Sequence, residues 1–211
     1  MAHDPNNVVA MGESIDSARV AMIMVHGRGA APRNILELVP MIDRPGVAYL
    51  APAAENNTWY PYSFLTDMSR NEPHLSSALS ALSTIVTQLV ARQIPREKIV
   101  LLGFSQGACL ASECAVRHAG RYGGVVALSG GIIGPPGTQW NFDGSFDGTP
   151  IFLGCSDVDP HVPLERIDET AHIFTQMGAA VTRRIYPGMG HFVNEDEIAA
   201  TQDLLDRILN Q

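Results

Sequence analysis

The chain has few cysteines, no excess of basic residues and no long uninterrupted apolar run. Its three cysteines are odd in number and lack the spacing of a metal site, so we expect free, buried thiols and a reduced cytoplasmic setting. No stretch approaches the roughly 18 apolar residues of a membrane helix, so we expect no stable membrane insertion. The first ten residues also lack the basic start and apolar run of a secretory signal.

Basic residues are outnumbered, 14 against 22 acidic ones, which gives a formal charge of -8 at neutral pH. A phosphate backbone must be met by clustered Lys and Arg, so this balance argues against nucleic acid as a partner. The chain is 45% hydrophobic and 17% charged, as in an ordinary globular protein. No repeat, linker or low-complexity tract divides it, and we assign residues 1–211 to a single domain.

Short apolar runs alternate along the chain with longer helical patterns. We expect strands at residues 20–25, 47–51, 99–103, 124–128, 150–154 and 181–186, with a further edge strand near 8–11. We expect helices at residues 34–41, 72–92, 106–117, 164–177 and 195–209. This alternation predicts an α/β fold with a mostly parallel central sheet flanked by helices. Such a sheet binds its ligands beyond the carboxyl ends of its strands.

The clearest motif is Gly-Phe-Ser-Gln-Gly at positions 103–107, between an apolar run and an expected helix. This is the strand–turn–helix context of a nucleophile elbow, in which small glycines allow a sharp turn and the serine hydroxyl projects above the sheet. The helix that follows favours developing negative charge at its N-terminus. We therefore identify Ser105 as the candidate nucleophile.

A serine hydroxyl is a poor nucleophile at neutral pH, and it needs a base that an acid orients. Nucleophile elbows of the α/β-hydrolase type are followed in the chain by the acid and then by the histidine. His191 ends the run Tyr-Pro-Gly-Met-Gly-His after the last expected strand, and it is the best candidate base. The acid is either Asp157 or Asp159, which both follow the strand at 150–154, and spacing alone leaves the choice open.

A third element, His-Gly-Arg-Gly at positions 26–29, follows the strand at 20–25. A glycine-rich turn at that place can present a backbone N–H to an oxyanion, and the N–H of Gln106, directly after the nucleophile, is the expected second donor. We expect His26 to have a structural role in this turn.

Together these segments resemble the phospholipase/carboxylesterase family of small α/β-hydrolases, which includes acyl-protein thioesterases and bacterial carboxylesterases. The carriers are His-Gly-Arg-Gly at 26–29, Gly-Phe-Ser-Gln-Gly-Ala at 103–108, Asp-Pro-His-Val-Pro at 159–163 and the run at 186–191. The resemblance implies that the acid is Asp159 and that the oxyanion donors are the backbone N–H groups of Arg28 and Gln106. It also implies an α/β-hydrolase fold, and relatives often form homodimers.

Two departures from the family pattern bear on specificity. Many relatives have Leu where Arg28 stands and Asp where Ala30 stands, and a cationic side chain at the rim can alter substrate preference. The Leu-Ser-Gly-Gly segment at 128–131 lacks the bulky residue that some thioesterase members carry there. The length leaves little room for a large cap domain, which predicts a shallow, open site for short or medium acyl chains.

The aromatic segment at 59–64 offers a wall for an apolar acyl pocket, because ligand sites are concave and largely apolar. The candidate substrate-binding residues are Trp59, Tyr60, Phe64, Met189 and Phe192. We therefore expect a serine carboxylesterase that acts on a small-molecule ester through Ser105, His191 and Asp159, with no metal and no cofactor. An acyl-thioesterase or lysophospholipase activity is the alternative, followed by a non-enzymatic ligand receptor on a hydrolase scaffold.

Overall fold

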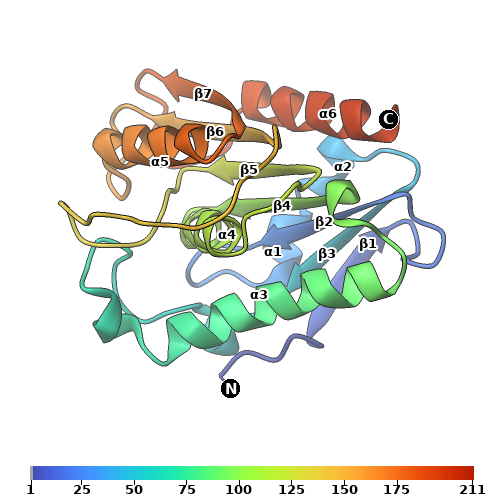
Figure 1. The fold of residues 1–211 in the computed structure, drawn as a ribbon, viewed down its shortest axis with the longest axis horizontal. Helices are drawn as coiled ribbons and strands as arrows, with labels where there is room; N and C mark the ends of the chain where they lie inside the picture. The colour runs from blue at the N-terminus through green and yellow to red at the C-terminus, as the bar shows by residue number, and fades with distance from the viewer. Residues whose placement is uncertain (1) are drawn as a thin grey trace.

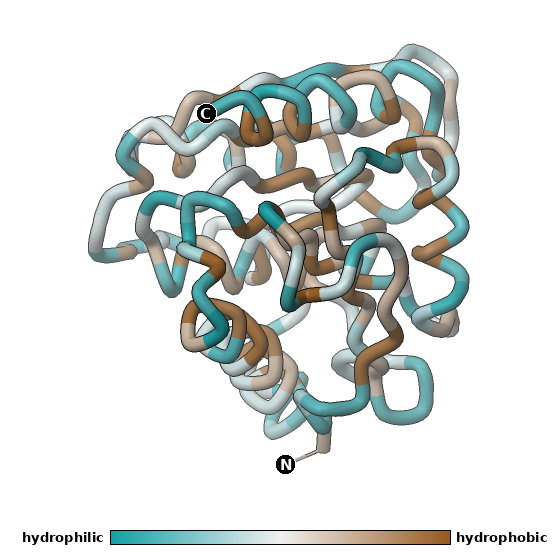
Figure 2. The backbone as a smooth tube through the Cα atoms, turned by 90° about the vertical axis from the view of Figure 1, so that its right-hand side faces the viewer, coloured by the Kyte–Doolittle hydropathy of each residue, from teal (hydrophilic) through white to brown (hydrophobic). Residues whose placement is uncertain are grey.

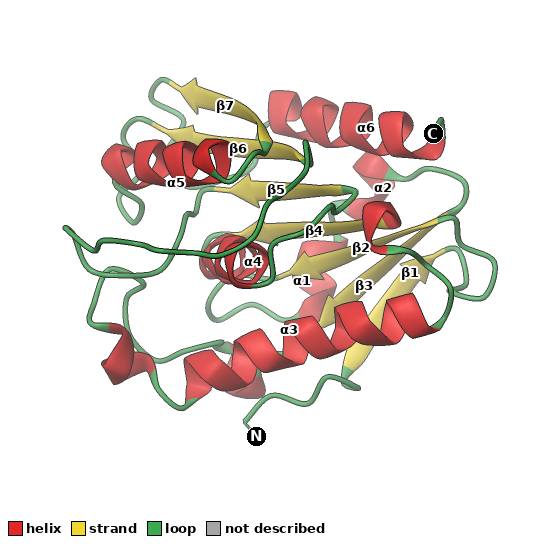
Figure 3. Cartoon of the chain, viewed as in Figure 1, coloured by secondary structure: helices red, strands yellow, loops and turns green. Residues whose placement is uncertain are grey.

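A computed structural model describes residues 2–211, and within them the chain forms one seven-stranded sheet with helices on both faces (Figures 1 and 3). The strands are β1 (Val8–Gly12), β2 (Val20–Val25), β3 (Val47–Pro52), β4 (Ile99–Phe104), β5 (Gly124–Leu128), β6 (Pro150–Ser156) and β7 (Ala180–Tyr186). Their order in the sheet is β1-β3-β2-β4-β5-β6-β7. Only β1 runs antiparallel to its neighbour, and all other pairs are parallel.

The helices are α1 (Pro32–Leu36), α2 (Val39–Ile42), α3 (His74–Ala91), α4 (Gln106–Arg117), α5 (Leu164–Gln176) and α6 (Glu195–Leu209). Short 3₁₀ turns lie at Glu55–Asn57, Met68–Asn71 and Arg96–Lys98. The α/β fold and its mostly parallel sheet are confirmed, and the expected strands are present with small differences at their ends.

The single helix expected at residues 34–41 is wrong, because the chain forms α1 and α2 there instead. Pro40 lies in the first turn of α2. A proline has no N–H to donate to the carbonyl four residues earlier, so one continuous helix could not keep its hydrogen bonds through this position. The segment is helical as expected, but it is divided into two short helices.

The two faces of the sheet carry separate apolar cores. Side chains from α3, α4 and α5 pack on one face, and those from α1, α2 and α6 pack on the other. Alternate residues of a strand point to opposite faces, so Ile23 of β2 belongs to the first core and its neighbours Met22 and Met24 belong to the second. Figure 2 shows the hydrophobic residues along the interior strands and the hydrophilic ones on the outer turns.

Helix α3 is long and apolar enough to cross a membrane by length and composition, in contrast to the expectation that no stretch of the sequence approaches this limit. Half of its residues are buried. The buried positions include Leu75, Leu79 and Leu82 at helical spacing, and they pack in the core shared with α4. This burial identifies α3 as a core helix of the α/β fold.

Candidate active site

The parallel strands bring the predicted site segments to one edge of the sheet, beyond their carboxyl ends. Arg28 lies in the turn after β2, Ser105 follows β4 directly, Asp159 lies in the loop after β6 and His191 lies in the loop after β7. Residues from four distant parts of the sequence therefore meet where a parallel sheet places its ligand site.

Ser105 lies at a strained turn between β4 and α4, with φ 55° and ψ -122°. Such a conformation is costly for a residue with a side chain and persists only where the surroundings enforce it. Two glycines allow the turn. A Cβ on Gly103 would lie 2.3 Å from the carbonyl oxygen of Gly107, and one on Gly107 would lie 2.0 Å from that of Val25. Both positions require glycine because backbone atoms occupy the space.

His191 faces the serine. Its Nε2 lies 2.8 Å from Ser105 Oγ, and its side chain is 17% exposed. The ring packs between Phe104 and His161, with centroid distances of 4.9 Å and 4.8 Å. These contacts hold the imidazole where Nε2 can accept the hydroxyl proton.

Asp159 holds the other side of the imidazole, at 2.7 Å between its Oδ2 and His191 Nδ1. Its Oδ1 accepts backbone N–H bonds from His161 at 2.8 Å and Val162 at 3.1 Å. Burial alone would raise the pKa of this carboxyl, but the hydrogen bonds from His191 and His161 outweigh it and leave the pKa below its usual value. Asp159 is therefore held as a carboxylate against the imidazole.

Asp157, the alternative that spacing left open, lies elsewhere. Its Oδ1 accepts a 2.8 Å hydrogen bond from the backbone N–H of Gly188, in the loop that carries His191. The hydroxyl of Ser156 accepts a second bond from the N–H of Gly190, at 3.1 Å. Asp157 and Ser156 thus tie the loop after β7 to the loop after β6. Neither tie has a sequence signal beyond the general tendency of Ser and Asp to bond nearby backbone in turns.

The two residues whose backbone N–H groups are expected to bind an oxyanion lie in the turn after β2 and at the start of α4. Gln106 is the first residue of α4, where an N–H has no acceptor within its own helix. In the turn after β2 the N–H groups of Gly29 and Ala30 donate to Asn57 and Gly27. Arg28 lies beside them, and both Arg28 and Gln106 line the same pocket as Ser105.

The side chain of Gln106 has a role that sequence reasoning missed. Its Oε1 accepts from the N–H of Trp59 at 3.0 Å, and its Nε2 donates to the carbonyl of Tyr60 at 2.8 Å. The indole of Trp59 donates to the carbonyl of His26 at 2.9 Å. The residue after the nucleophile therefore anchors the aromatic segment and, through it, the turn after β2.

His26 has the contacts of a structural histidine. Its Nδ1 donates to the carbonyl of Gly27 at 2.8 Å, and its Nε2 accepts from the N–H of Ala54 at 3.2 Å. Burial lowers the pKa of its imidazole, which keeps the ring neutral. With both ring nitrogens engaged, this side chain fixes the turn that presents Arg28.

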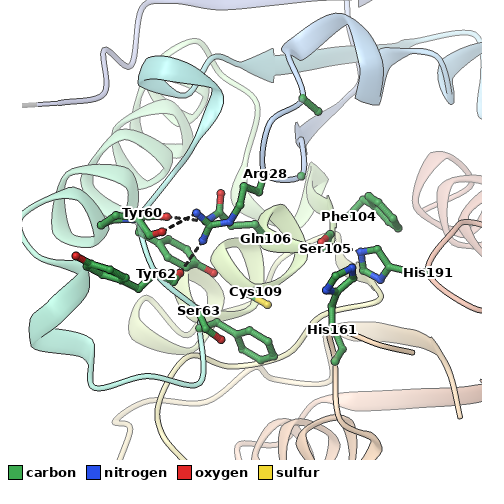
Figure 4. Close-up of a pocket in the computed structure, with 15 residues that line it drawn as sticks. Arg28, Tyr60, Tyr62, Ser63, Phe104, Ser105, Gln106, Cys109, His161 and His191 are labelled. Carbon is green, nitrogen blue, oxygen red and sulfur yellow. Dashed lines mark hydrogen bonds between the residues drawn. The ribbon is translucent and has the colours of Figure 1, made fainter. Parts of the chain in front are cut away.

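A pocket of about 570 Å³ opens above Ser105 (Figure 4). Its lining includes Tyr60 and Phe64 from the predicted set. Besides the predicted catalytic and oxyanion residues, the lining contains residues that were not predicted to bind substrate, namely Gly27, Ala30, Pro61, Tyr62, Ser63, Phe104, Cys109, His161 and Val162. Burial raises the pKa of the Cys109 thiol to about 12, so this lining residue is a neutral apolar surface rather than a second nucleophile.

Three predicted substrate-binding residues lie outside the pocket lining. Trp59 is fully buried beneath the wall, where it packs against His26 and bonds to its carbonyl. Met189 points to the start of α6, where its sulfur accepts from the amide of Asn194. Phe192 is 53% exposed. The aromatic segment suggested Trp59, and the positions beside His191 suggested Met189 and Phe192, but none of these three side chains is among the lining residues. Among residues 2–211, no group of His, Cys, Asp and Glu is arranged to hold a metal ion.

The sheet order and the Ser105–His191–Asp159 arrangement at its edge are those of an α/β-hydrolase. The sequence profile of the phospholipase/carboxylesterase family matches residues 6–209, and the chain belongs to that family of hydrolases.

The chain is also similar to a solved structure that carries the name of this family and to two acyl-protein thioesterases. A crystal structure of a phospholipase/carboxylesterase from Dyadobacter fermentans has 39% sequence identity and a TM-score of 0.92, covering 99% of this chain and 98% of that one. Acyl-protein thioesterase 1 of Candida albicans is 26% identical over 92% of this chain and 94% of that protein. The same enzyme of Debaryomyces hansenii is 32% identical over 61% of this chain, and there the match spans only 56% of the relative's length.

Proposed function

We propose that the protein is a serine carboxylesterase that hydrolyses short- to medium-chain carboxylic esters through an acyl-enzyme. The observation that carries this proposal is the continuous hydrogen-bonded chain from Ser105 Oγ through His191 to Asp159, at the base of an open pocket. Nucleophile, base and orienting acid are the three groups that acyl transfer by serine requires.

In the first step the Oγ of Ser105 attacks the ester carbonyl while His191 Nε2 takes its proton. Asp159 holds Nδ1–H and stabilises the imidazolium that forms. The backbone N–H groups of Arg28 and Gln106 bind the oxyanion, each contributing about 3 kcal/mol to lowering the barrier. His191 then gives the proton to the departing alcohol, and water hydrolyses the acyl-enzyme by the same route.

The shape of the pocket supports a small acyl group. Tyr60, Phe64 and Val162 give it apolar walls, and its volume of about 570 Å³ is in the range of small-molecule sites. Acyl-thioester hydrolysis is the second candidate, because several relatives are named acyl-protein thioesterase 1. The same serine chemistry cleaves both bonds, so substrate profiling separates the two.

The remaining proposals concern partners and location. We infer a small-molecule ester as the substrate, no nucleic-acid partner and no stable membrane insertion, with a homodimer as the assembly that the family resemblance favours. The three cysteines are free and buried, which agrees with a reduced cytoplasmic setting.

The test is hydrolysis of p-nitrophenyl esters and matched thioesters of increasing acyl length by the wild type and by Ser105→Ala. We expect turnover by the wild type with a maximum at short or medium chains, and loss of turnover in Ser105→Ala. Activity that survives in Ser105→Ala would refute the serine mechanism. A folded wild type that turns over no ester or thioester would favour a ligand receptor on this scaffold.

A further inference from the structure

The pocket above Ser105 carries an uncompensated positive charge. Arg28 lines it, whereas no Asp or Glu among the described residues does, although the chain as a whole has a formal charge of -8. The lining also contains the imidazoles of His161 and His191. An acidic protein therefore presents a basic side chain, and no acidic one, to its substrate.

Arg28 also differs from the arginines that pair with carboxylates. Arg44, Arg92, Arg117, Arg166, Arg183 and Arg184 each form an ion pair. Within residues 2–211, Arg28 forms none. Its Nη1 donates to the carbonyl of Pro61 at 2.8 Å, and its Nη2 donates to that of Tyr62 at 2.6 Å. Carbonyl oxygens orient a guanidinium but leave its charge unneutralised.

These bonds hold the guanidinium in one place and leave it donors to spare. A guanidinium has five N–H groups, and these contacts use two. The charged carbon lies 5.9 Å from the centre of the Tyr60 ring, which also lines the pocket. Because the side chain is already oriented, a bound anion would cost little further rotamer entropy.

Figure 4 shows the guanidinium turned toward Tyr60 and Tyr62, with His161 and His191 on the opposite side of Ser105. The carbonyls that hold Arg28 belong to the aromatic segment that we assign to the acyl wall. The positive charge of Arg28 therefore lies beside the segment assigned to acyl binding, away from Ser105 and the ester carbonyl that it would attack.

We propose that the pocket selects esters whose acyl portion ends in a carboxylate, with Arg28 as the specificity-determining residue. This inference rests on the proposed esterase function. A guanidinium matches a carboxylate in geometry and charge, and an apolar wall accommodates the methylene groups between that carboxylate and the ester. Half-esters of short dicarboxylic acids have this chemistry.

The test compares two substrates of the same length, monomethyl glutarate and methyl pentanoate, which differ by a carboxylate in place of the terminal methyl. The kcat/KM ratio of the anionic to the neutral ester is measured for the wild type, Arg28→Gln, Arg28→Lys and Arg33→Gln. Arg33→Gln removes the same charge from an exposed position in α1 outside the pocket lining.

We expect Arg28→Gln to lower the ratio about tenfold, corresponding to about 1.4 kcal/mol, and Arg28→Lys to retain most of it. Arg33→Gln should leave the ratio at the wild-type value. A role for Arg28 only in holding the wall would lower kcat/KM for both esters alike, and an unchanged ratio in Arg28→Gln would overturn the inference while leaving the esterase proposal intact. If the wild type turns over neither ester but hydrolyses p-nitrophenyl esters in a Ser105-dependent way, the inference alone is overturned; absence of Ser105-dependent turnover of the methyl and the p-nitrophenyl esters would refute both proposals.

Discussion

The nucleophile and its base are held in place by different means. Ser105 follows β4, whose neighbours in the sheet are β2 and β5, and all three strands are almost wholly buried. His191 follows β7, an edge strand with mostly exposed or half-buried residues. Backbone packing without room for a Cβ fixes the serine, whereas side-chain hydrogen bonds between two loops fix the histidine.

This difference predicts different sensitivities. The serine side, which is the turn at residues 103–107, should be destabilised when a side chain gains volume, because close-packed backbone cannot move without strain. The histidine side comprises the loop after β7, the loop after β6 that it bonds to, and the start of α6. It should tolerate changes in volume and lose its geometry when a hydrogen-bonding partner is removed, because that geometry depends on a few hydrogen bonds. Substitutions that change the volume of a side chain and keep its polar contacts, or the reverse, can separate these two kinds of support.

The largest effect is expected from Asp159→Asn, which keeps the size of the side chain and removes its charge. The amide cannot stabilise the imidazolium, and it favours the wrong imidazole tautomer. We expect kcat to fall about 10³- to 10⁴-fold, measured with the best p-nitrophenyl ester. Asp157→Asn is the matched control, because it removes the same charge from a carboxylate that accepts from the Gly188 N–H and does not contact the imidazole. A fall of less than about tenfold is expected there, and equal losses in the two variants would contradict the assignment of the acid.

The matching test on the serine side adds one methyl group. In Gly107→Ala the new Cβ would lie 2.0 Å from the carbonyl oxygen of Val25. We expect the free energy of unfolding to fall by about 4 kcal/mol, measured by urea denaturation. Gly27→Ala is the control, because its Cβ would meet the Cβ of Ser105 at 3.4 Å, an ordinary contact. Similar stability in the two variants would show that the elbow yields more easily than its packing implies.

The same contrast explains what the sequence could predict. The elbow is encoded locally, since Gly103, Ser105 and Gly107 are consecutive elements of one motif between a strand and a helix. Alternating apolar and helical patterns likewise predicted the sheet and its direction. These features depend on short-range sterics and periodicity, which are visible in one segment at a time.

The pocket wall and the acid depend on tertiary contacts that no local pattern contains. Trp59 and Tyr60 are adjacent, both are almost fully buried and Gln106 bonds to the backbone of both, yet only Tyr60 is among the residues that line the cavity. Asp157 and Asp159 are equivalent in spacing, and only the family resemblance favoured Asp159 before the loop geometry was known. Which side chain faces the cavity is decided by partners far away in sequence.

Gln106→Leu tests this long-range anchor, with an apolar side chain of similar size. It would leave the buried N–H of Trp59 and the carbonyl of Tyr60 without partners. Each unsatisfied group costs about 1 to 3 kcal/mol, so we expect a loss of about 3 kcal/mol in the free energy of unfolding. Activity on medium-chain esters should fall as the wall loosens. A loss below about 1 kcal/mol would mean that the aromatic segment is held by packing alone.

The smallest effect concerns pH, and it belongs to the histidine side. Glu197 is buried in the first turn of α6, where one carboxyl oxygen accepts from the N–H of Asn194 and the other, Oε1, has no partner among the described residues. Burial raises the pKa of this carboxyl to about 7, against the partial opposition of the Asn194 N–H. The folded protein therefore retains a proton that the unfolded chain releases at lower pH.

A retained proton stabilises the folded state below the unfolded pKa, and this contribution is lost as the pH rises through the folded pKa. Between about pH 5 and 7, Glu197 should make the free energy of unfolding fall by up to about 1.4 kcal/mol per pH unit. Glu197→Gln keeps an oxygen for Asn194 but cannot titrate, so this part of the slope should disappear. Urea denaturation of both proteins across that range measures it. Parallel stability curves would mean that Glu197 is already ionised when folded, and that the histidine side tolerates a buried charge as well as it tolerates volume.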